Sequence, residues 1–476
     1  MRDSWTPRPA DRVVRHPRVD EIGPVHFIAA DRKTPKRLAS APFVLIYAFI
    51  ALILLGTIFL LMPFSRVGGG FAPFTTALFT ATSAVTVTGL TVEHTGMYWT
   101  LVGQIGIMLM IFLGGLGYMT FATFLLLMLR RRVSLSHRLV LSQSLGTDQL
   151  GDLVRLASNI TIVAVAIQVV GSVVLFLRFR SLYPAGEAIW HSVFHSVSAF
   201  NNAGFVSLTE PEGMVKYHGD FAILGAIGLL VLLGGISYWV MVDVVRHRRF
   251  ALFTLNTKLV LVVSAALLLV GTALFFVAEY DNPQTLQPLP LQEKLGIAFF
   301  ESIMSRTAGF DAIDMSRAMQ ETAFFLTALM FIGGATGSVA GGIKVNTFGV
   351  LMAAVWCILR GRSRTTIFGR EIPLEQVMRA MAIITVSVGF IFLVALLLSF
   401  SDHGFPFIHL FFETVSAFGT VGLSLGVTGD LSTFGRLLLV VTMLIGRVGP
   451  FAIAFAMASR PRGDVIRYAN ESVNIG

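Results

Sequence analysis

The sequence predicts an all-α integral membrane protein of four helix–pore loop–helix repeats, with eight transmembrane helices around one pseudo-fourfold pore. Three observations lead to this prediction. The 476 residues are 55% hydrophobic and 13% charged, with a mean hydropathy of +0.76, which excludes an ordinary soluble enzyme. Eight apolar stretches could cross a bilayer, since a spanning helix needs about 20 residues. Each pair of stretches encloses a shorter apolar segment that leads into a glycine.

The elements follow in a regular order along the chain. We expect spanning helices at 43–63, 99–129, 153–178, 218–245, 257–279, 320–358, 377–400 and 432–457. Between the members of each pair we expect re-entrant half-helices at 73–83, 188–200, 292–304 and 407–417. Non-helical backbone at membrane depth is tolerated only where protein covers it or where it lines a water-filled cavity. The half-helices therefore favour a pore.

The glycines that end the half-helices define the repeats. Gly89, Gly204, Gly309 and Gly422 are separated by 115, 105 and 113 residues, a period too long for a solenoid. We assign repeats to 41–130, 150–249, 255–360 and 374–459, a basic N-terminal arm to 1–40 and a C-terminal tail to 460–476.

The distribution of basic residues predicts the orientation. Of the 36 Lys and Arg, 26 lie in segments 1–40, 130–155, 246–258, 359–379 and 460–467, and eight, Arg306 among them, lie in the intervening outer segments. This asymmetry predicts cytoplasmic termini and glycine loops that open outward. The net charge of +9 then reflects topology and contact with anionic lipid, and nucleic acid is not an expected partner.

The N-terminal arm and the single cysteine each favour a simple interpretation. The arm 1–40 has no compact apolar run, so we expect no cleaved signal peptide. A solvated tail is favoured over docking to another subunit. Cys357 stands alone, which excludes an intrachain disulfide framework and favours a structural thiol.

The glycine loops have the chemistry of a cation pathway. Glycine permits the positive φ that turns successive carbonyls toward one axis, and rings of carbonyls can replace the hydration shell of an alkali cation. Half-helices that point their C-terminal ends at the pore would add negative potential there. A bend in a packed helix is the alternative for any single loop, but four loops in matching positions favour a filter.

The loop sequences resemble the four pore loops of the Trk/Ktr/HKT superfamily of potassium transporters. The matching segments are Thr86-Val87-Thr88-Gly89-Leu90, Asn201-Asn202-Ala203-Gly204-Phe205, Ser305-Arg306-Thr307-Ala308-Gly309-Phe310 and Gly419-Thr420-Val421-Gly422-Leu423. The resemblance runs from about residue 40 to the end. Without an additional N-terminal helix pair, the chain is most similar to the KtrB-type membrane subunits of the Ktr branch. Asn474-Ile475-Gly476 resembles the tail that these subunits place at a homodimer interface.

The resemblance implies a transported ion and a set of coordinating carbonyls. Glycine at position 89 implies potassium as the only metal, whereas serine there in some plant members favours sodium. Sodium remains a candidate activator, and no covalent cofactor is expected. Because the four loops differ, we expect fewer equivalent carbonyl rings than in a fourfold-symmetric channel, and moderate selectivity. The implied carbonyls belong to Val87, Thr88, Gly89, Asn202, Ala203, Gly204, Thr307, Ala308, Gly309, Thr420, Val421 and Gly422.

The sixth apolar stretch contains a glycine-rich segment at 333–342. Each glycine costs about 1 kcal/mol relative to alanine inside a helix, so this segment should break the helix. Close helix packing through small residues is the alternative. The segment resembles the intramembrane gating loop of Trk and Ktr subunits, although Thr336 and Val339 replace the proline and threonine common there. The implied gate residues are Gly333, Gly334, Gly337, Ser338, Gly341, Gly342, Lys344 and Arg447.

Two of these residues are basic and lie within apolar stretches. An unpaired charge at the position of Arg447 would cost at least ~2.5 kcal/mol in lipid, so its side chain should face protein. A pair with Glu301 or Glu413 and a position beside the glycine-rich loop are both open. For Lys344, extension to the membrane interface explains the residue as well as a gating role.

Three residues at and before the second half-helix have the spacing of metal ligands. Glu187, His191 and His195 recur every four residues on one helical face, as paired metal ligands do. No matching cluster supplies further ligands, so packing at the outer collar is favoured. His195 lies nine residues before its glycine, as do Thr80 and Glu413, whereas Glu301 lies eight before, which leaves the register of the third loop open.

We therefore expect a multi-pass plasma-membrane protein that translocates potassium under the membrane potential and is not an enzyme. A self-sufficient cation channel and an intramembrane metalloenzyme are the alternatives. No nucleotide-binding motif is present. The Ktr resemblance implies a homodimer and a cytoplasmic ring of RCK-type subunits that binds ATP or ADP. The ring would press on basic loops, although topology alone also explains them: Arg130-Arg131-Arg132 and Arg360-Gly361-Arg362.

Overall fold

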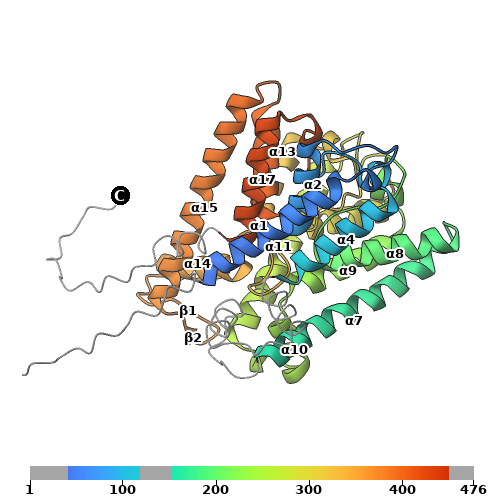
Figure 1. Cartoon of the computed structure of the whole chain (residues 1–476). Helices are drawn as coiled ribbons and strands as arrows, with labels where there is room; N and C mark the ends of the chain where they lie inside the picture. The colour runs from blue at the N-terminus through green and yellow to red at the C-terminus, as the bar shows by residue number, and fades with distance from the viewer. Residues whose placement is uncertain (1–40, 118–152, 450–476) are drawn as a thin grey trace, which may run out of the picture. The chain divides into compact units, whose positions relative to one another are not determined.

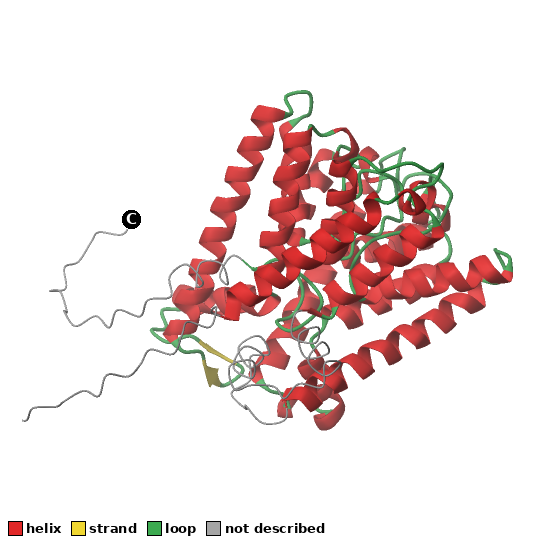
Figure 2. Cartoon of the chain, viewed as in Figure 1, coloured by secondary structure: helices red, strands yellow, loops and turns green. Residues whose placement is uncertain are grey.

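The computed structural model describes residues 41–117 and 153–449. The predicted arm 1–40, the arginines 130–132 and the tail 460–476 with its expected dimer contacts lie outside the described residues. The described chain is helical apart from loops and one short antiparallel hairpin of β1 (Thr366–Ile367) and β2 (Arg370–Glu371), as Figure 2 shows.

Four helix–half-helix–helix units follow one another along the chain (Figure 1). The first helices are α1 (Ala41–Leu61), α7 (Leu153–Phe179), α11 (Leu255–Glu279) and α15 (Leu374–Ser401). The half-helices are α2 (Phe74–Thr86), α8 (Ala185–Phe200), α12 (Leu291–Met304) and α16 (Phe407–Gly419), close to their predicted ranges. The second helices are α4 (Leu101–Gly115), α9 (Phe221–Gly235), α13 (Gln320–Phe331) and α17 (Thr433–Val448).

Shorter elements connect these helices. Between each half-helix and the following second helix lies one short helix or helical turn. These elements are α3 (Thr95–Tyr98), Gly213–Tyr217, Met315–Arg317 and Thr428–Asp430. A turn at Pro63–Ser65 follows α1, and one at Phe250–Leu252 precedes α11. Two further helices, α10 (Tyr238–His247) and α14 (Val345–Leu359), continue the second and third repeats.

The first and second helices of the repeats differ in length. Within the described residues, α7, α11 and α15 are long and apolar enough to cross a membrane, and the bent pair α9–α10 makes a possible fourth span. The second helices have only 12 to 16 residues, which is about 18–24 Å against a hydrocarbon core of about 30 Å. Over their described lengths, the second helices are therefore too short to cross that core.

Two predicted spans are broken. The stretch 320–358 breaks between Phe331 and Val345, as expected. The prediction of a continuous helix over 218–245 was wrong, because α9 ends at Gly235 and α10 leaves it at 96°. The physical reason is local: the carbonyls of Gly234 and Gly235 accept N–H groups from the glycine-rich segment, at 3.3 and 3.0 Å, so they are not available to continue the helix. The stretches 99–129 and 432–457 are described only to 117 and 449.

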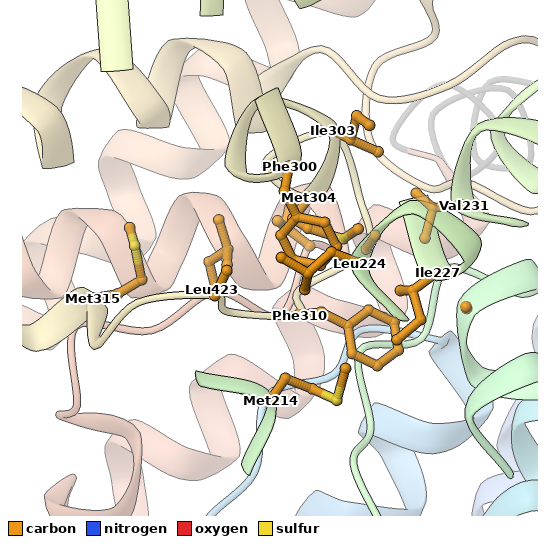
Figure 3. Close-up of a cluster of buried hydrophobic side chains, with 14 of the residues drawn as sticks. Met214, Leu224, Ile227, Val231, Phe300, Ile303, Met304, Phe310, Met315 and Leu423 are labelled. Atoms are coloured by element: carbon orange, nitrogen blue, oxygen red, sulfur yellow. The ribbon is translucent and has the colours of Figure 1, made fainter. Parts of the chain in front are cut away.

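The half-helices form the centre of the packing. Figure 3 shows Phe300 and Met304 of α12 against Leu224, Ile227 and Val231 of α9, with Phe310 beside them. The first helices turn apolar side chains outward instead, with Leu177, Val277 and Phe400 exposed by 66% or more. An apolar surface of this kind is expected to face lipid.

Glycines on the second helices bring these helices into contact with the half-helices. A Cβ added to Gly114, Gly234 or Gly446 would overlap the carbonyl oxygen of Val85, Phe200 or Phe418, respectively. Each of these carbonyls lies four residues before the glycine of its loop. The sequence analysis missed these three positions, although a Gly-Gly pair or a Gly-x-x-Gly spacing late in each apolar stretch was a visible signal.

Candidate functional site

The four loops after the half-helices have the same backbone conformation. Their glycines have positive φ: 93° at Gly89, 68° at Gly204, 65° at Gly309 and 96° at Gly422. The residue two positions earlier is also left-handed in each loop, at Val87, Asn202, Thr307 and Thr420. Because the two left-handed positions recur at the same offset, the third loop is in register with the others at its glycine.

The four glycines, here called the filter ring, close around one axis. A Cβ on Gly89 would come within 2.5 Å of the carbonyl oxygen of Ala203, and one on Gly204 within 2.7 Å of that of Ala308. The same overlap joins Gly309 to the carbonyl of Val421, and Gly422 to that of Thr88. Each glycine thus lies against the residue that precedes the next glycine, and no larger residue fits.

Serines at the ends of the half-helices hold the ring. In the first and fourth loops, the N–H groups of Gly89 and Gly422 donate to the hydroxyls of Ser83 and Ser416, at 3.0 and 3.1 Å. In the second loop, the Ser198 hydroxyl donates to the Phe205 carbonyl at 2.9 Å. These bonds fix the backbone beside the glycine in three of the four loops.

The third loop reaches its glycine by a shorter path. In the other loops an N–H bond to the carbonyl five residues earlier starts from the residue before the glycine, as from Thr88 to Ser83 at 2.8 Å. In the third loop the corresponding bond starts from Gly309 itself and ends at Met304, at 3.3 Å. One residue is therefore missing between helix and ring, which explains why Glu301 lies eight rather than nine positions before its glycine.

A cavity of about 640 Å³, here called the vestibule, lies directly over the filter ring. The four ring glycines form part of its lining, and the loops that follow the ring form the rest. Three carboxylate residues, Glu212, Asp311 and Asp314, are also among the lining residues. Burial raises the pKa of Asp311, and the charges of Asp314 and Glu413 raise it further.

The glycine-rich segment lies against the opposite side of the ring. Residues 333–344 form no helix, and the segment is closed by bonds from Gly333 N–H to Ile343 O and from Val345 N–H to Gly334 O, at 2.8 and 3.0 Å. A Cβ on Gly341 would overlap the Thr420 side chain, and one on Gly333 would lie 3.2 Å from the Thr307 methyl. The segment is a loop beneath the third and fourth filter loops, so the alternative of a continuous helix with a small-residue interface was wrong.

The remaining residues of the loop have defined positions. Gly337 and Gly342 have positive φ, and Gly342 packs near Gly419 of the fourth filter loop. The Ser338 hydroxyl accepts from Ala340 N–H at 3.3 Å, and the Thr336 N–H donates to Asn346 at 2.9 Å.

Arg447 binds carbonyls rather than a carboxylate. Its guanidinium donates to the carbonyl of Val339 in the loop and to those of Gly114 and Gly115 at the end of α4, the last two at 2.5 and 3.5 Å. Glu301 and Glu413 accept bonds from other groups, so of the two open alternatives the ion pair does not hold. Arg447 instead links the loop to the first repeat.

Lys344 and Arg306 also bind the loop. The Lys344 ammonium donates to Ala340 O at 2.5 Å and Gly341 O at 3.3 Å, so the side chain folds back and does not extend to the interface. Arg306 donates to the Ser264 carbonyl at 3.2 Å and to Gly333 O at 3.5 Å. Its placement among the outer basic residues was wrong, because it reaches from the filter loop toward the loop beneath. The sequence analysis assigned it no role.

Comparison with known proteins identifies the family. The sequence profile of a family described as "TrkH: Cation transport protein" matches residues 23–468. The chain belongs to this family. It is 37% identical over 435 residues to the Ktr system potassium uptake protein B of Bacillus subtilis (strain 168), covering 91% of this chain and 96% of the relative.

Other relatives cover similar shares. The Ktr system potassium uptake protein B of Vibrio alginolyticus is 37% identical over 94% of this chain and 98% of the relative. The potassium/sodium uptake protein NtpJ of Enterococcus hirae is 36% identical over 94% of this chain and 99% of the relative. The crystal structure of the potassium transporter TrkH from Vibrio parahaemolyticus shares the fold, with a TM-score of 0.68 at 19% identity over 90% of this chain and 86% of that one. The family and the fold confirm the predicted helical membrane architecture with pore-loop repeats.

The three candidate metal ligands, Glu187, His191 and His195, do not form a common site. His191 Nδ1 pairs with the Ser207 hydroxyl at 2.9 Å, and His195 Nδ1 with the His191 carbonyl at 2.7 Å. Glu187 is exposed in the first turn of α8. The described part of the chain contains no group of three His, Cys, Asp or Glu residues that could hold a metal ion. The favoured interpretation, packing at the outer collar, fits these contacts.

Proposed function

We propose that this chain is the potassium-translocating membrane subunit of a Ktr-type potassium uptake system. The observation that carries the proposal is the filter ring, in which four positive-φ glycines pack against the carbonyls of their neighbours beneath an acidic vestibule. The relatives named as potassium uptake proteins, which match over nine-tenths of the chain, support the choice of ion.

Selectivity would arise from backbone carbonyls and helix ends together. In this proposal the carbonyls of the twelve residues named above replace the hydration shell of potassium. Because the half-helices end next to the ring, their C-terminal dipoles would stabilise a cation there. Glycine at position 89 favours potassium, and the shorter third loop is consistent with moderate selectivity.

The loop 333–342 would act as the gate. It lies against the ring, and the charges of Arg447 and Lys344 are bonded to its carbonyls. A fixed positive charge below the filter opposes the passage of a cation. We infer that the closed gate is the state in which these two side chains hold the loop, and that conduction requires the loop to move.

The proposal also includes the repeats, the membrane location and the partners of the subunit. The repeats are 41–130, 150–249, 255–360 and 374–459, in a plasma-membrane protein with cytoplasmic termini. The subunit would form a homodimer through its tail 460–476 and bind a cytoplasmic RCK-type ring, with ATP or ADP acting only through that ring and sodium as a candidate activator. The name "Ktr system" of two relatives supports a multi-component system. Transport needs no covalent chemistry, so no enzymatic activity is proposed.

Flux measurements on the purified chain test the proposal. In potassium-loaded liposomes we expect cation efflux that Gly89→Asp abolishes, because no side chain fits at the ring. His191→Ala with His195→Ala should leave efflux intact, which separates transport from any metal chemistry at α8. If the unmodified chain, with or without a nucleotide-binding ring, releases no potassium, the proposal is wrong.

The partner requires a separate test. Pull-down of an RCK-type ring from detergent extract, with Arg360→Gln and Arg362→Gln in parallel, would show whether these exposed arginines take part. We expect weaker capture by the double variant. Equal capture would leave topology as the reason for the basic loop.

A further inference from the structure

The third filter loop lacks the serine bond that supports the ring in the other three loops. The Ser305 hydroxyl donates to the Ser302 carbonyl of its own half-helix at 3.1 Å. The Gly309 N–H donates to the Met304 carbonyl at 3.3 Å instead of to a hydroxyl. Within the described residues, no serine hydroxyl is bonded to the backbone of Gly309 or Phe310. The ring backbone of the third loop therefore needs another support.

Arg306 lies three positions before the ring glycine and differs from the residues at this offset in the other loops. Thr86 and Asn201 bond back to carbonyls of their own half-helices, at 2.7 and 2.8 Å. The fourth loop has Gly419 there, which has no side chain. Arg306 instead extends away from its half-helix and bonds to other elements.

The Arg306 guanidinium joins three elements. Nη1 donates to the carbonyl of Ser264 and Nη2 to its hydroxyl, both at 3.2 Å, within the spanning helix α11. Nη2 also donates at 3.5 Å to the carbonyl of Gly333, the first residue of the loop 333–342. The Gly333 N–H is bonded in turn to the Ile343 carbonyl at 2.8 Å. The third filter loop is thus tied to α11 and to the start of the loop beneath it.

The residues after Arg306 are those whose carbonyls are proposed to coordinate the ion. Thr307 follows directly, and a Cβ on Gly333 would lie 3.2 Å from its methyl group. The Thr307 hydroxyl pairs with the Asn202 side chain at 3.2 Å. Ala308 comes next, and its carbonyl oxygen lies against Gly204 of the ring. A displacement of Arg306 would therefore shift carbonyls of the filter itself.

We propose that Arg306 is a positioning residue for ion selectivity, which holds the third filter loop in place of the missing serine bond. The inference rests on the proposed function. Selectivity by carbonyls depends on their number and position around the ion, and those of Thr307 and Ala308 are adjacent to the Arg306 attachment. The planar guanidinium reaches Ser264 and Gly333 together, whereas a lysine ammonium carries the same charge without that fork.

Relative efflux of potassium and sodium from liposomes tests the proposal. Arg306→Gln and Arg306→Lys should each lower the potassium-to-sodium efflux ratio by about tenfold, as expected for a lost hydrogen bond from a charged group. Ser264→Ala removes only the hydroxyl acceptor and should lower the ratio by about threefold. Added to Arg306→Gln, it should have no further effect on the ratio, because both variants remove the same interaction.

Arg436→Gln is the matched control. Arg436 on α17 also donates to a backbone carbonyl, that of Gly429 at 2.6 Å, but this carbonyl belongs to the turn before α17 and not to a filter loop. We expect the efflux ratio to be unchanged in this variant. A general effect of removing a buried arginine would lower the ratio here as well, and would contradict the proposal.

Thermal unfolding in detergent gives a readout that needs no transport. An ion that binds only the folded chain raises the unfolding temperature. The unmodified chain should therefore unfold at a higher temperature in potassium chloride than in sodium chloride of equal concentration. This difference should shrink in both Arg306 variants and persist in Arg436→Gln.

Several outcomes would overturn the proposal. One is an unchanged efflux ratio in Arg306→Gln, and another is a full ratio in Arg306→Lys, which would assign the effect to charge alone. Equal unfolding temperatures of the unmodified chain in the two salts would also overturn it. If Arg306→Gln does not fold, Arg306→Lys and Ser264→Ala still decide. If the unmodified chain passes no potassium, the proposed function fails instead, and the difference in unfolding temperature still shows whether Arg306 affects ion preference.

Discussion

The chain leaves helical geometry both at the filter ring and at the loop 333–342, and the two regions are held by different interactions. Every ring glycine is in close contact with the carbonyl of a neighbouring loop. The loop has looser places, since a Cβ on Gly337 would come no closer than 3.9 Å to the nearest atom. Charged side chains and a few backbone bonds anchor it. Close packing gives the ring one geometry, whereas bonds to charged groups can be exchanged.

The difference in rigidity between the ring and the loop can be tested by adding one methyl group to each. Gly422→Ala and Gly337→Ala both place alanine at positive φ, at 96° and 81°, which costs about 1–2 kcal/mol. Only Gly422→Ala also meets backbone, at the Thr88 carbonyl and the Gly89 Cα. We expect potassium efflux to fall at least about a hundredfold in Gly422→Ala, since overlap with backbone typically costs 1–3 kcal/mol more, and to change by less than about tenfold in Gly337→Ala. Similar losses in both would show that the two regions are equally rigid.

A second test examines the glycines that attach the second helices to the ring. Gly234→Ala would push α9 against the Phe200 carbonyl, whereas Gly225 on the same helix has no atom within 4 Å of an added Cβ. We expect Gly234→Ala to destabilise the protein by about 1–3 kcal/mol, and Gly225→Ala to stabilise it by about 0.5–1 kcal/mol. Thermal unfolding in detergent measures both. A stable Gly234→Ala variant would mean that α9 is free to move away from the half-helix.

Removal of the charged anchor tests the loop alone. Arg447→Gln loses the bonds to Val339 and Gly114, and hydrogen bonds to charged groups contribute about 1.5–3 kcal/mol each. We expect potassium efflux without a partner ring to rise by about tenfold, because the loop is released. Arg447→Lys should have an intermediate effect, since an ammonium lacks the planar fork of a guanidinium. Unchanged efflux in Arg447→Gln would exclude this residue from gating.

The smallest effect is expected at the outer surface of the second repeat. Burial alone would raise the pKa of Glu210, but hydrogen bonds from Lys216 and Tyr183 lower it below its ordinary value. A lowered pKa stabilises the fold above the pKa of the unfolded chain, and this stabilisation is lost as pH falls through the native pKa. We expect an acid loss of at most about 1 kcal/mol, as for a surface pair. Lys216→Met should reduce this loss in acid unfolding experiments, and an identical acid profile would contradict the assignment.

Much of the fold was predictable because apolar length and glycine position are direct signals. The half-helices, the positive φ of the four glycines and the break before Val345 all follow from residue type. The bend after Gly235 did not, because its cause is a pair of bonds from a segment about 100 residues later in the chain. The partners of Arg447 could not be predicted either, because every residue has a backbone carbonyl and residue type does not show which one accepts a bond.

In the candidate site, too, some features follow from residue type and spacing and others from long-range contacts. Residue spacing indicated that the third loop was irregular, and the backbone bonds explain it as one residue missing before the ring. Spacing could not predict the partners of the two glutamates. Glu413 accepts bonds from the hydroxyls of Ser424 and Thr428, whereas Glu301 accepts the N–H of Ala312. Long-range contacts of this kind become visible only in three dimensions.

The contact between Gly422 and Thr88 has a consequence for the synthesis of the protein. It joins the last repeat to the first, so the ring cannot close until nearly the whole chain has entered the membrane. A chain that ended after the third repeat would lack the contacts of Gly422 with Thr88 and with Gly309, and its ring would stay open. The closed ring therefore depends on a contact between the first and the last repeat of the chain.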